Sequence, residues 1–207
     1  MKKDITELFV FIDDFTSAAD LHFKKCLIAT SDKLNKPTRT TQIISAEILT
    51  IILLYHQSPC KNFKYFYLSY LQLYKSEFPN LVSYEQFVIL KPRIIMNLAL
   101  LLDWLISCSK QTGISFVDAT SINICHAKRI SSNKVFRGFA KLSKTTKGWF
   151  FGFKLHIVIN DIGEFQGVQL TKGNVDDRTP VPYLVQNLQG LLFGDKGYIK
   201  SDWLCRI

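Results

Sequence analysis

Cysteine pairs are absent from this chain of 207 residues, although it has five cysteines. The cysteines lie at wide, irregular spacings, and no two form a CxxC pair. We therefore expect reduced thiols in the cytoplasm and no disulfide framework. Cys125 and His126 are adjacent, but neighbours on a strand point to opposite faces and make poor joint ligands. The pattern argues against a zinc site.

Long apolar runs are also absent. The two most apolar runs, residues 48–55 and 94–102, are far shorter than the roughly 20 residues that a membrane-spanning helix needs. The chain opens with Met and two lysines and reaches Asp4 at once, which does not fit a secretory signal. These features predict a soluble cytoplasmic protein without a membrane partner.

Acidic side chains are missing from one long segment, because none occurs between Asp118 and Asp161. The chain has 26 Lys and Arg against 17 Asp and Glu, a net charge of +9. Such an excess favours a polyanionic partner, nucleic acid before an acidic membrane surface. A solvated loop that only keeps the protein soluble is the alternative. The basic side chains crowded here are candidates for contacts with DNA phosphates: Lys128, Arg129, Lys134, Arg137, Lys141, Lys144 and Lys147.

Composition and periodicity predict two domains and an α+β fold. Hydrophobic residues make up 47% of the chain and charged residues 21%, so we expect packed cores. Helical periodicity runs through residues 1–112, and strand-like patterns begin after Gly113. We therefore expect an all-helical domain at residues 1–112 and a mixed-sheet α/β domain at residues 113–207.

The first half is expected to hold five helices. Ser45 is a candidate N-cap for the second helix, and Ser83 with Gln86 forms a capping-box pattern before the fourth. Pro92 should break the chain before the last helix. The expected helices cover residues 1–25, 45–57, 63–76, 83–91 and 94–107, with a polar linker at residues 33–41.

The second and third helices, with the turn at residues 59–62, form a candidate helix-turn-helix DNA reader. Lys61 and Lys64 lie at the start of the third helix, where they could meet phosphates. The aromatic side chains of this helix are explained equally well by core packing. Both interpretations stay open on the sequence alone.

In the second half, two short apolar strands each deliver one aspartate, Asp118 and Asp195, 77 positions apart. A crossover helix before the last strand allows that strand to lie parallel beside the first, which would bring the two carboxylates together. The expected elements are strands at residues 115–119, 149–160, 164–171 and 191–194, and a helix from Asp176 or Asp177 to about Leu188.

Two neighbouring carboxylates repel each other unless a cation lies between them. Mg²⁺ (or Mn²⁺) prefers hard oxygen ligands and needs only one or two protein carboxylates when a phosphate supplies further oxygens. Two such ions can activate the attacking oxygen and stabilise the leaving oxygen at phosphorus. Asp118 and Asp195 are thus candidate metal ligands for phosphodiester chemistry, although a lone Asp at a strand end is often only a turn residue.

Four motifs carry a resemblance that covers roughly residues 110–200. They are FVDAT at residues 116–120, GWFFGFKLH at 148–156, GNVDDR at 173–178 and GDKGY at 194–198. In this order they resemble the DDE-type transposases of bacterial insertion sequences. The resemblance implies an RNase H-like catalytic domain in which Asp118 and Asp195 are the first two catalytic acids.

The resemblance also implies Mg²⁺- or Mn²⁺-dependent DNA cleavage and strand transfer. The implied partners are double-stranded DNA, at terminal inverted repeats and at the target, and a second copy of the chain; the implied location is the bacterial cytoplasm, at the nucleoid. Asp176 and Asp177 are interpreted as helix caps. Lys154 and His156 lie on a strand whose exposed face explains them, the alternative being that they face the site or DNA.

The third acid of the family, a glutamate, comes from a helix several tens of residues beyond the second Asp. This sequence ends at Ile207, twelve residues past Asp195. We therefore expect a truncated transposase that is inactive alone. The alternatives are a non-catalytic DNA-binding protein or repressor that binds the element's ends, and a helical partner-binding protein whose basic charge has no DNA function.

Overall fold

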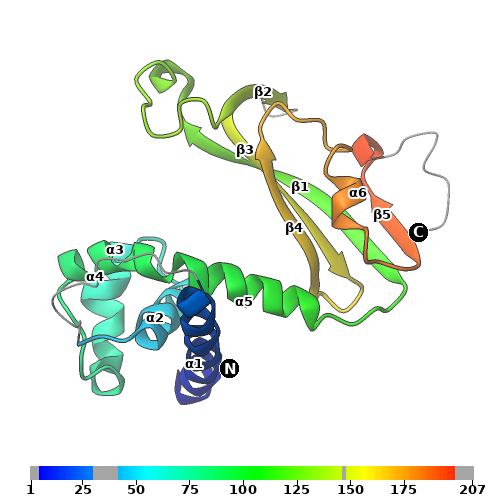
Figure 1. The fold of residues 1–207 in the computed structure, drawn as a ribbon. Helices are drawn as coiled ribbons and strands as arrows, with labels where there is room; N and C mark the ends of the chain where they lie inside the picture. The colour runs from blue at the N-terminus through cyan, green and yellow to red at the C-terminus, as the bar shows by residue number, and fades with distance from the viewer. Residues whose placement is uncertain (1–4, 30–41, 146–147, 199–207) are drawn as a thin grey trace. The chain divides into compact units, whose positions relative to one another are not determined.

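The structure is a computed structural model that describes residues 5–29, 42–145 and 148–198. The chain divides into two compact units, residues 1–103 and 104–207 (Figure 1). The first unit is helical and the second is built on a five-stranded sheet. The α+β fold expected from the sequence is confirmed. The domain limits expected at residues 112 and 113 stay a prediction.

The described part of the first unit consists of helices, and the last helix crosses the boundary of the unit. The linker expected at residues 33–41 lies outside the described residues. The regular α-helices are α1 (Ile5–Ala29), α2 (Ser45–Gln57), α3 (Phe63–Tyr65), α4 (Tyr84–Leu90) and α5 (Ile95–Ser107). A π-helical segment, η1 (Phe66–Tyr70), and a 3-10 segment, η2 (Leu71–Glu77), continue α3, and a 3-10 turn, η3 (Lys91–Ile94), precedes α5.

Side chains at the helix starts explain where these helices begin. Ser83 accepts a hydrogen bond from the Gln86 backbone N–H at 3.3 Å, as its capping-box pattern predicts. The cap expected of Ser45 is wrong, because Ile44 is the N-cap residue and its N–H donates to the Glu47 carboxylate at 2.9 Å. The Glu47 carboxylate therefore satisfies the backbone N–H of the N-cap residue, and the apolar Ile44 side chain makes no capping hydrogen bond.

The aromatic third helix contributes mainly to the core of the first unit. Phe66 is fully buried and Tyr67 is 2% exposed. The Tyr67 hydroxyl donates to the Val82 carbonyl at 2.7 Å, which satisfies its polar end inside the core. Tyr65 by contrast is 62% exposed. Core packing therefore accounts for the most buried aromatic positions of this helix.

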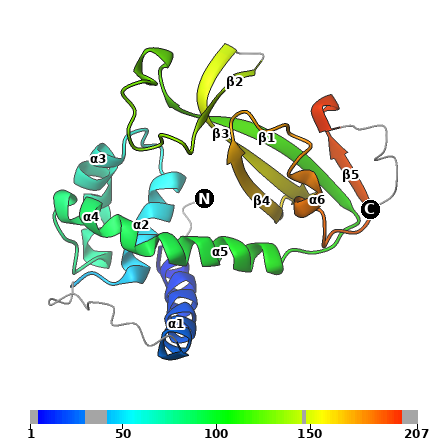
Figure 2. The ribbon, with the colours of Figure 1, turned by 45° about the horizontal axis from the view of Figure 1, so that its top comes forward.

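The second unit contains one mixed sheet (Figure 1, Figure 2). The strands β1 and β3 pair antiparallel, β3 returns to β4 as a hairpin, and β5 pairs parallel with β1. The parallel neighbour predicted for the first strand is therefore confirmed. The strands are β1 (Ile114–Cys125), β2 (Lys141–Thr145), β3 (Gly148–Asn160), β4 (Phe165–Lys172) and β5 (Leu191–Gly194), in the order β2-β3-β1-β5 with β4 also on β3.

Burial alternates along the central strands, as period-two strand geometry requires. On β3, His156 and Val158 are fully buried, whereas their immediate neighbours on the strand are partly exposed. Val117 and Val158 pack against Val181 and Leu184. One face of the sheet is therefore covered by the helix α6 (Val181–Leu184). The other face carries Phe116, which is 43% exposed.

Two details of this unit differ from the expectations. The helix predicted from Asp176 or Asp177 to about Leu188 is only one turn, α6 (Val181–Leu184), and its N-cap is Pro180. The strand β2 falls inside the basic segment and was not expected. None of the described helices is both long and apolar enough to cross a membrane.

Candidate active site

Asp118 lies in the middle of β1, on its exposed face. It pairs in register with Ile157 of β3, and its neighbours Val117 and Ala119 turn toward the covered face. The Asp118 carboxylate accepts a hydrogen bond from the backbone N–H of Ala119 at 2.7 Å. The aspartate is therefore held within the strand ladder while its side chain remains open to a ligand.

Asp195 is the residue that directly follows β5. The last pair of the parallel ladder joins Val117 to Gly194, so Asp118 and Asp195 are the next positions on two neighbouring strands. The rings of Phe116 and Phe193, two residues earlier on each strand, stack with centroids 5.7 Å apart and mark the shared face. Because paired parallel strands lie about 4.8 Å apart, the register brings the two aspartates together at this edge of the sheet.

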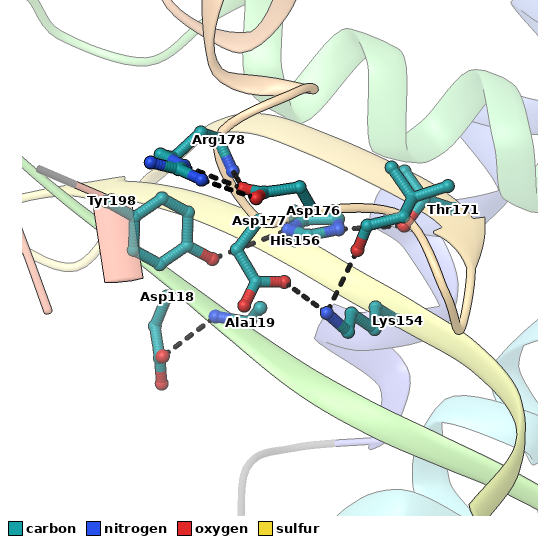
Figure 3. Close-up of polar contacts among 10 residues, drawn as sticks. Asp118, Ala119, Lys154, His156, Thr171, Asp176, Asp177, Arg178 and Tyr198 are labelled. Carbon is teal, nitrogen blue, oxygen red and sulfur yellow. Dashed lines mark hydrogen bonds and ion pairs between the residues drawn. The ribbon is translucent and has the colours of Figure 1, made fainter. Parts of the chain in front are cut away.

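On the opposite, covered face of the sheet, polar side chains contact one another in series (Figure 3). His156 Nε2 lies 2.9 Å from the Thr171 hydroxyl, and His156 Nδ1 lies 3.4 Å from the Tyr198 hydroxyl. The Asp118 carboxylate is directed away from the Tyr198 ring. The prediction that His156 lies on an exposed strand face is therefore wrong. This residue faces neither Asp118 and Asp195 nor solvent.

Lys154 lies on the same covered face and joins the sheet to the loop before α6. Its Nζ donates to the Asp177 carboxylate at 2.8 Å and to the Val175 carbonyl at 3.0 Å. The side chains of Lys154 and Asp177 are 15% and 33% exposed. Asp177 is therefore an ion-pair partner and not a helix cap.

Asp176 also does not cap α6. Its carboxylate accepts hydrogen bonds from the Arg178 guanidinium at 2.9 and 2.6 Å and from the Arg178 backbone N–H at 2.9 Å. Hydrogen bonds from the Arg178 side chain, and to a smaller extent from its backbone N–H, hold the pKa of Asp176 well below its usual range. Both aspartates of the GNVDDR motif thus stabilise the loop instead of a helix end.

The buried groups have shifted pKa values with clear causes. Burial lowers the pKa of His156 and outweighs the opposing effect of the nearby Asp177 carboxylate. Burial raises the pKa of Tyr198, and the carboxylates of Asp177, Asp118 and Asp195 raise it further. Tyr198 is therefore an un-ionised phenol at neutral pH, with three carboxylates close enough to act on it.

The donor set at the sheet edge fits a hard divalent cation. Two carboxylates offer only oxygen ligands, which Mg²⁺ and Mn²⁺ prefer and which do not make a zinc site of the usual Cys and His type. In the part of the chain that the structure describes, no cluster of three or more His, Cys, Asp or Glu side chains could hold a metal.

The basic residues lie along the connection between β1 and β2 and on β2 itself. Lys128 and Arg129 end a 3-10 turn, η4 (Ala127–Arg129), and Lys141 and Lys144 are on β2. Lys147 falls outside the described residues. The two salt bridges found among the described residues involve none of this set. The exposed members are Lys128, Arg129, Lys134, Arg137, Lys141 and Lys144.

The helix-turn-helix candidate in the first unit has a well-formed start. Asn62 accepts hydrogen bonds from the backbone N–H groups of Lys64 and Tyr65 at 2.8 and 3.2 Å and so begins α3. The Lys64 ammonium lies 5.7 Å from the centroid of the Tyr84 ring. The helix that follows loses regular α-geometry after one turn.

Comparisons with known proteins identify the second unit. Residues 108–207 match the family model of the transposase DDE domain. No curated protein and no solved structure matches the chain. The match supports a general role in transposition. Transposase DDE domains in general depend on divalent metal ions and bind DNA. Residues 108–207, which include Asp118 and Asp195, are therefore similar to the DDE domain of transposases.

Proposed function

We propose that the chain acts in transposition of an insertion sequence, by binding the element's DNA ends and placing a phosphodiester at Asp118 and Asp195. The observation that carries this proposal is the register of β1 and β5, in which these aspartates follow the last paired residues of two parallel strands. Strand transfer to target DNA would use the same site.

Asp118 and Asp195 would hold the metal. When bound there, Mg²⁺ or Mn²⁺ supplies activation of the attacking oxygen and stabilisation of the leaving oxygen at phosphorus. The protein's own contribution is positioning: the ladder fixes Asp118, and the Ala119 N–H orients its carboxylate at 2.7 Å. A carboxylate held in this way needs little rearrangement when a cation arrives.

The exposed basic residues between β1 and β3 would contact DNA phosphates. Lys134, Arg137 and Lys144 are exposed and belong to a segment without any acid, so their charges are not neutralised locally. Binding to phosphates would release counterions from DNA, which makes affinity fall as salt rises. The helix-turn-helix candidate of the first unit is a second surface for the same ligand.

A second candidate function is DNA-end binding without cleavage, as in a repressor of transposition. It is favoured by the exposed basic residues between β1 and β3, which can bind DNA phosphates without any cleavage. Both candidates require binding to the element's inverted repeats, and they differ in turnover.

The experiment is a cleavage assay with the full chain, Mn²⁺ and duplex DNA from the ends of the element that encodes it. Cleavage that disappears in Asp118→Asn supports the transposase, whereas binding without cleavage supports the repressor. A chain that shows neither salt-dependent binding nor cleavage contradicts both candidates.

A further inference from the structure

Three side chains from three elements contact one another in series on the covered face of the sheet, opposite the candidate site (Figure 3). His156 of β3 lies between the hydroxyl of Thr171 on β4, at 2.9 Å, and the hydroxyl of Tyr198, at 3.4 Å. His156 is fully buried and Tyr198 is 7% exposed. Burial of these polar groups is tolerated because each one finds a hydrogen-bond partner.

Tyr198 connects this chain directly to Asp195. Its backbone N–H donates to the Asp195 carbonyl at 2.9 Å and closes the turn η5 (Lys196–Tyr198). Gly194 lets the ring approach the sheet, because a Cβ there would lie 2.8 Å from Val117 Cγ1 and 3.2 Å from Tyr198 Cβ. The turn that carries Asp195 is therefore packed at Gly194 and tied at Tyr198.

The two aspartates differ in how they are held. Asp118 sits inside the β1–β3 ladder, paired with Ile157, with further pairs on both sides of it. Asp195 lies one residue beyond the last β1–β5 pair, which joins Val117 to Gly194. Its backbone is consequently held by the turn and not by the ladder.

We propose that Tyr198 and His156 are positioning residues for Asp195: the contact chain from Thr171 through His156 to the Tyr198 hydroxyl fixes the turn and holds this carboxylate beside Asp118. The inference rests on the proposed metal-binding role of the two aspartates. It adds residues that touch neither metal nor DNA and that lie on the covered face of the sheet.

The test removes single hydroxyls from the full chain. Tyr198→Phe removes the contact with His156 and keeps the ring. Thr171→Val removes the contact between Thr171 and His156, which does not involve the turn itself. Tyr183→Phe is the matched control, because Tyr183 is 61% exposed on α6 of the same unit. Thermal unfolding checks that each variant is folded.

Two readouts are measured: Mn²⁺ affinity, and NMR-detected hydrogen exchange at the Tyr198 amide relative to the Val158 amide in the sheet. Tyr198→Phe should speed the relative exchange about two- to tenfold, as expected when one hydrogen bond is removed. It should weaken Mn²⁺ binding on the order of tenfold, as changes behind a metal ligand do. Thr171→Val should act in the same direction more weakly, and Tyr183→Phe should change neither.

Failure of this inference is distinguishable from failure of the proposed function. If the unmodified chain binds Mn²⁺ and Tyr198→Phe changes neither affinity nor relative exchange, or only one of them, the positioning role is wrong. If the unmodified chain binds no Mn²⁺, the proposed metal site is wrong and exchange alone decides. Faster relative exchange then supports the link from His156 to Asp195, and unchanged exchange overturns it.

Discussion

Phe116 and Phe193 stack across β1 and β5 with ring centroids 5.7 Å apart. Each phenylalanine lies two positions before an aspartate, Asp118 on β1 and Asp195 after β5. Since side chains two apart on a strand share a face, the ring pair and the carboxylate pair form successive layers of one arrangement. The ring pair thus stabilises the register in which Asp118 and Asp195 are neighbours.

The basic segment should bind DNA through its charge. Replacing Lys134 and Arg137 with alanine should lower affinity at all DNA sequences alike, and reduce the slope of log affinity against log salt by about one for each phosphate that is no longer neutralised. Filter binding or fluorescence anisotropy over a salt series measures this. The control is Arg93→Ala, since Arg93 is exposed in η3 and lies outside both the basic segment and the helix-turn-helix candidate. Equal effects from control and test variants would contradict a dedicated surface.

The Lys154–Asp177 ion pair should contribute more to stability than Asp176–Arg178. The first pair is 15% and 33% exposed and the second is 44% and 50% exposed. Lys154→Met leaves a half-buried carboxylate without its partner and should cost about 1–3 kcal/mol. Arg178→Met breaks an exposed pair and should cost less, because solvent screens the two charges. Urea unfolding compares the two, and a larger loss in Arg178→Met would reverse the assignment.

His156 should make stability depend on pH in the mildly acidic range. Its pKa is lowered in the folded chain, so below the usual value of 6.5 the unfolded state binds more protons and stability falls as pH drops toward the folded pKa. Above that value the contribution is complete. His156→Gln should flatten this decline in unfolding free energy, whereas His56→Gln, at an exposed position of α2, should not. A decline that persists unchanged in His156→Gln would assign it to other groups.

Strand patterns in the sequence predicted much of the site. The residues from Trp149 to Asn160 are aromatic and β-branched enough to define β3, and residues 191–194 define β5. The crossover argument then predicted the parallel β1–β5 pair. β2 was missed because two of the five residues in its KLSKT sequence are lysines, so that it resembles an exposed loop.

Other features depend on contacts that no local pattern reveals. Residues 176–188 have a helical start signal but also Pro180 and Pro182, and only one turn of helix forms. His156 and Tyr198 are 42 positions apart, so their contact appears only when β3 and η5 pack. The alternation of β3 could have placed His156 with the buried Val158, which is the signal that an exposed-face interpretation overlooked.

The central claim is that Asp118 and Asp195 together hold a divalent metal. The most direct measurement is Mn²⁺ binding by the full chain, followed by electron paramagnetic resonance, in Asp118→Asn, Asp195→Asn and the control Asp176→Asn. We predict that the first two variants each lose affinity by more than the ~10–100-fold caused by changes behind a ligand. Asp176→Asn, whose carboxylate pairs with Arg178, should bind like the unmodified chain. Equal binding by all four proteins, or no binding by the unmodified chain, would contradict it.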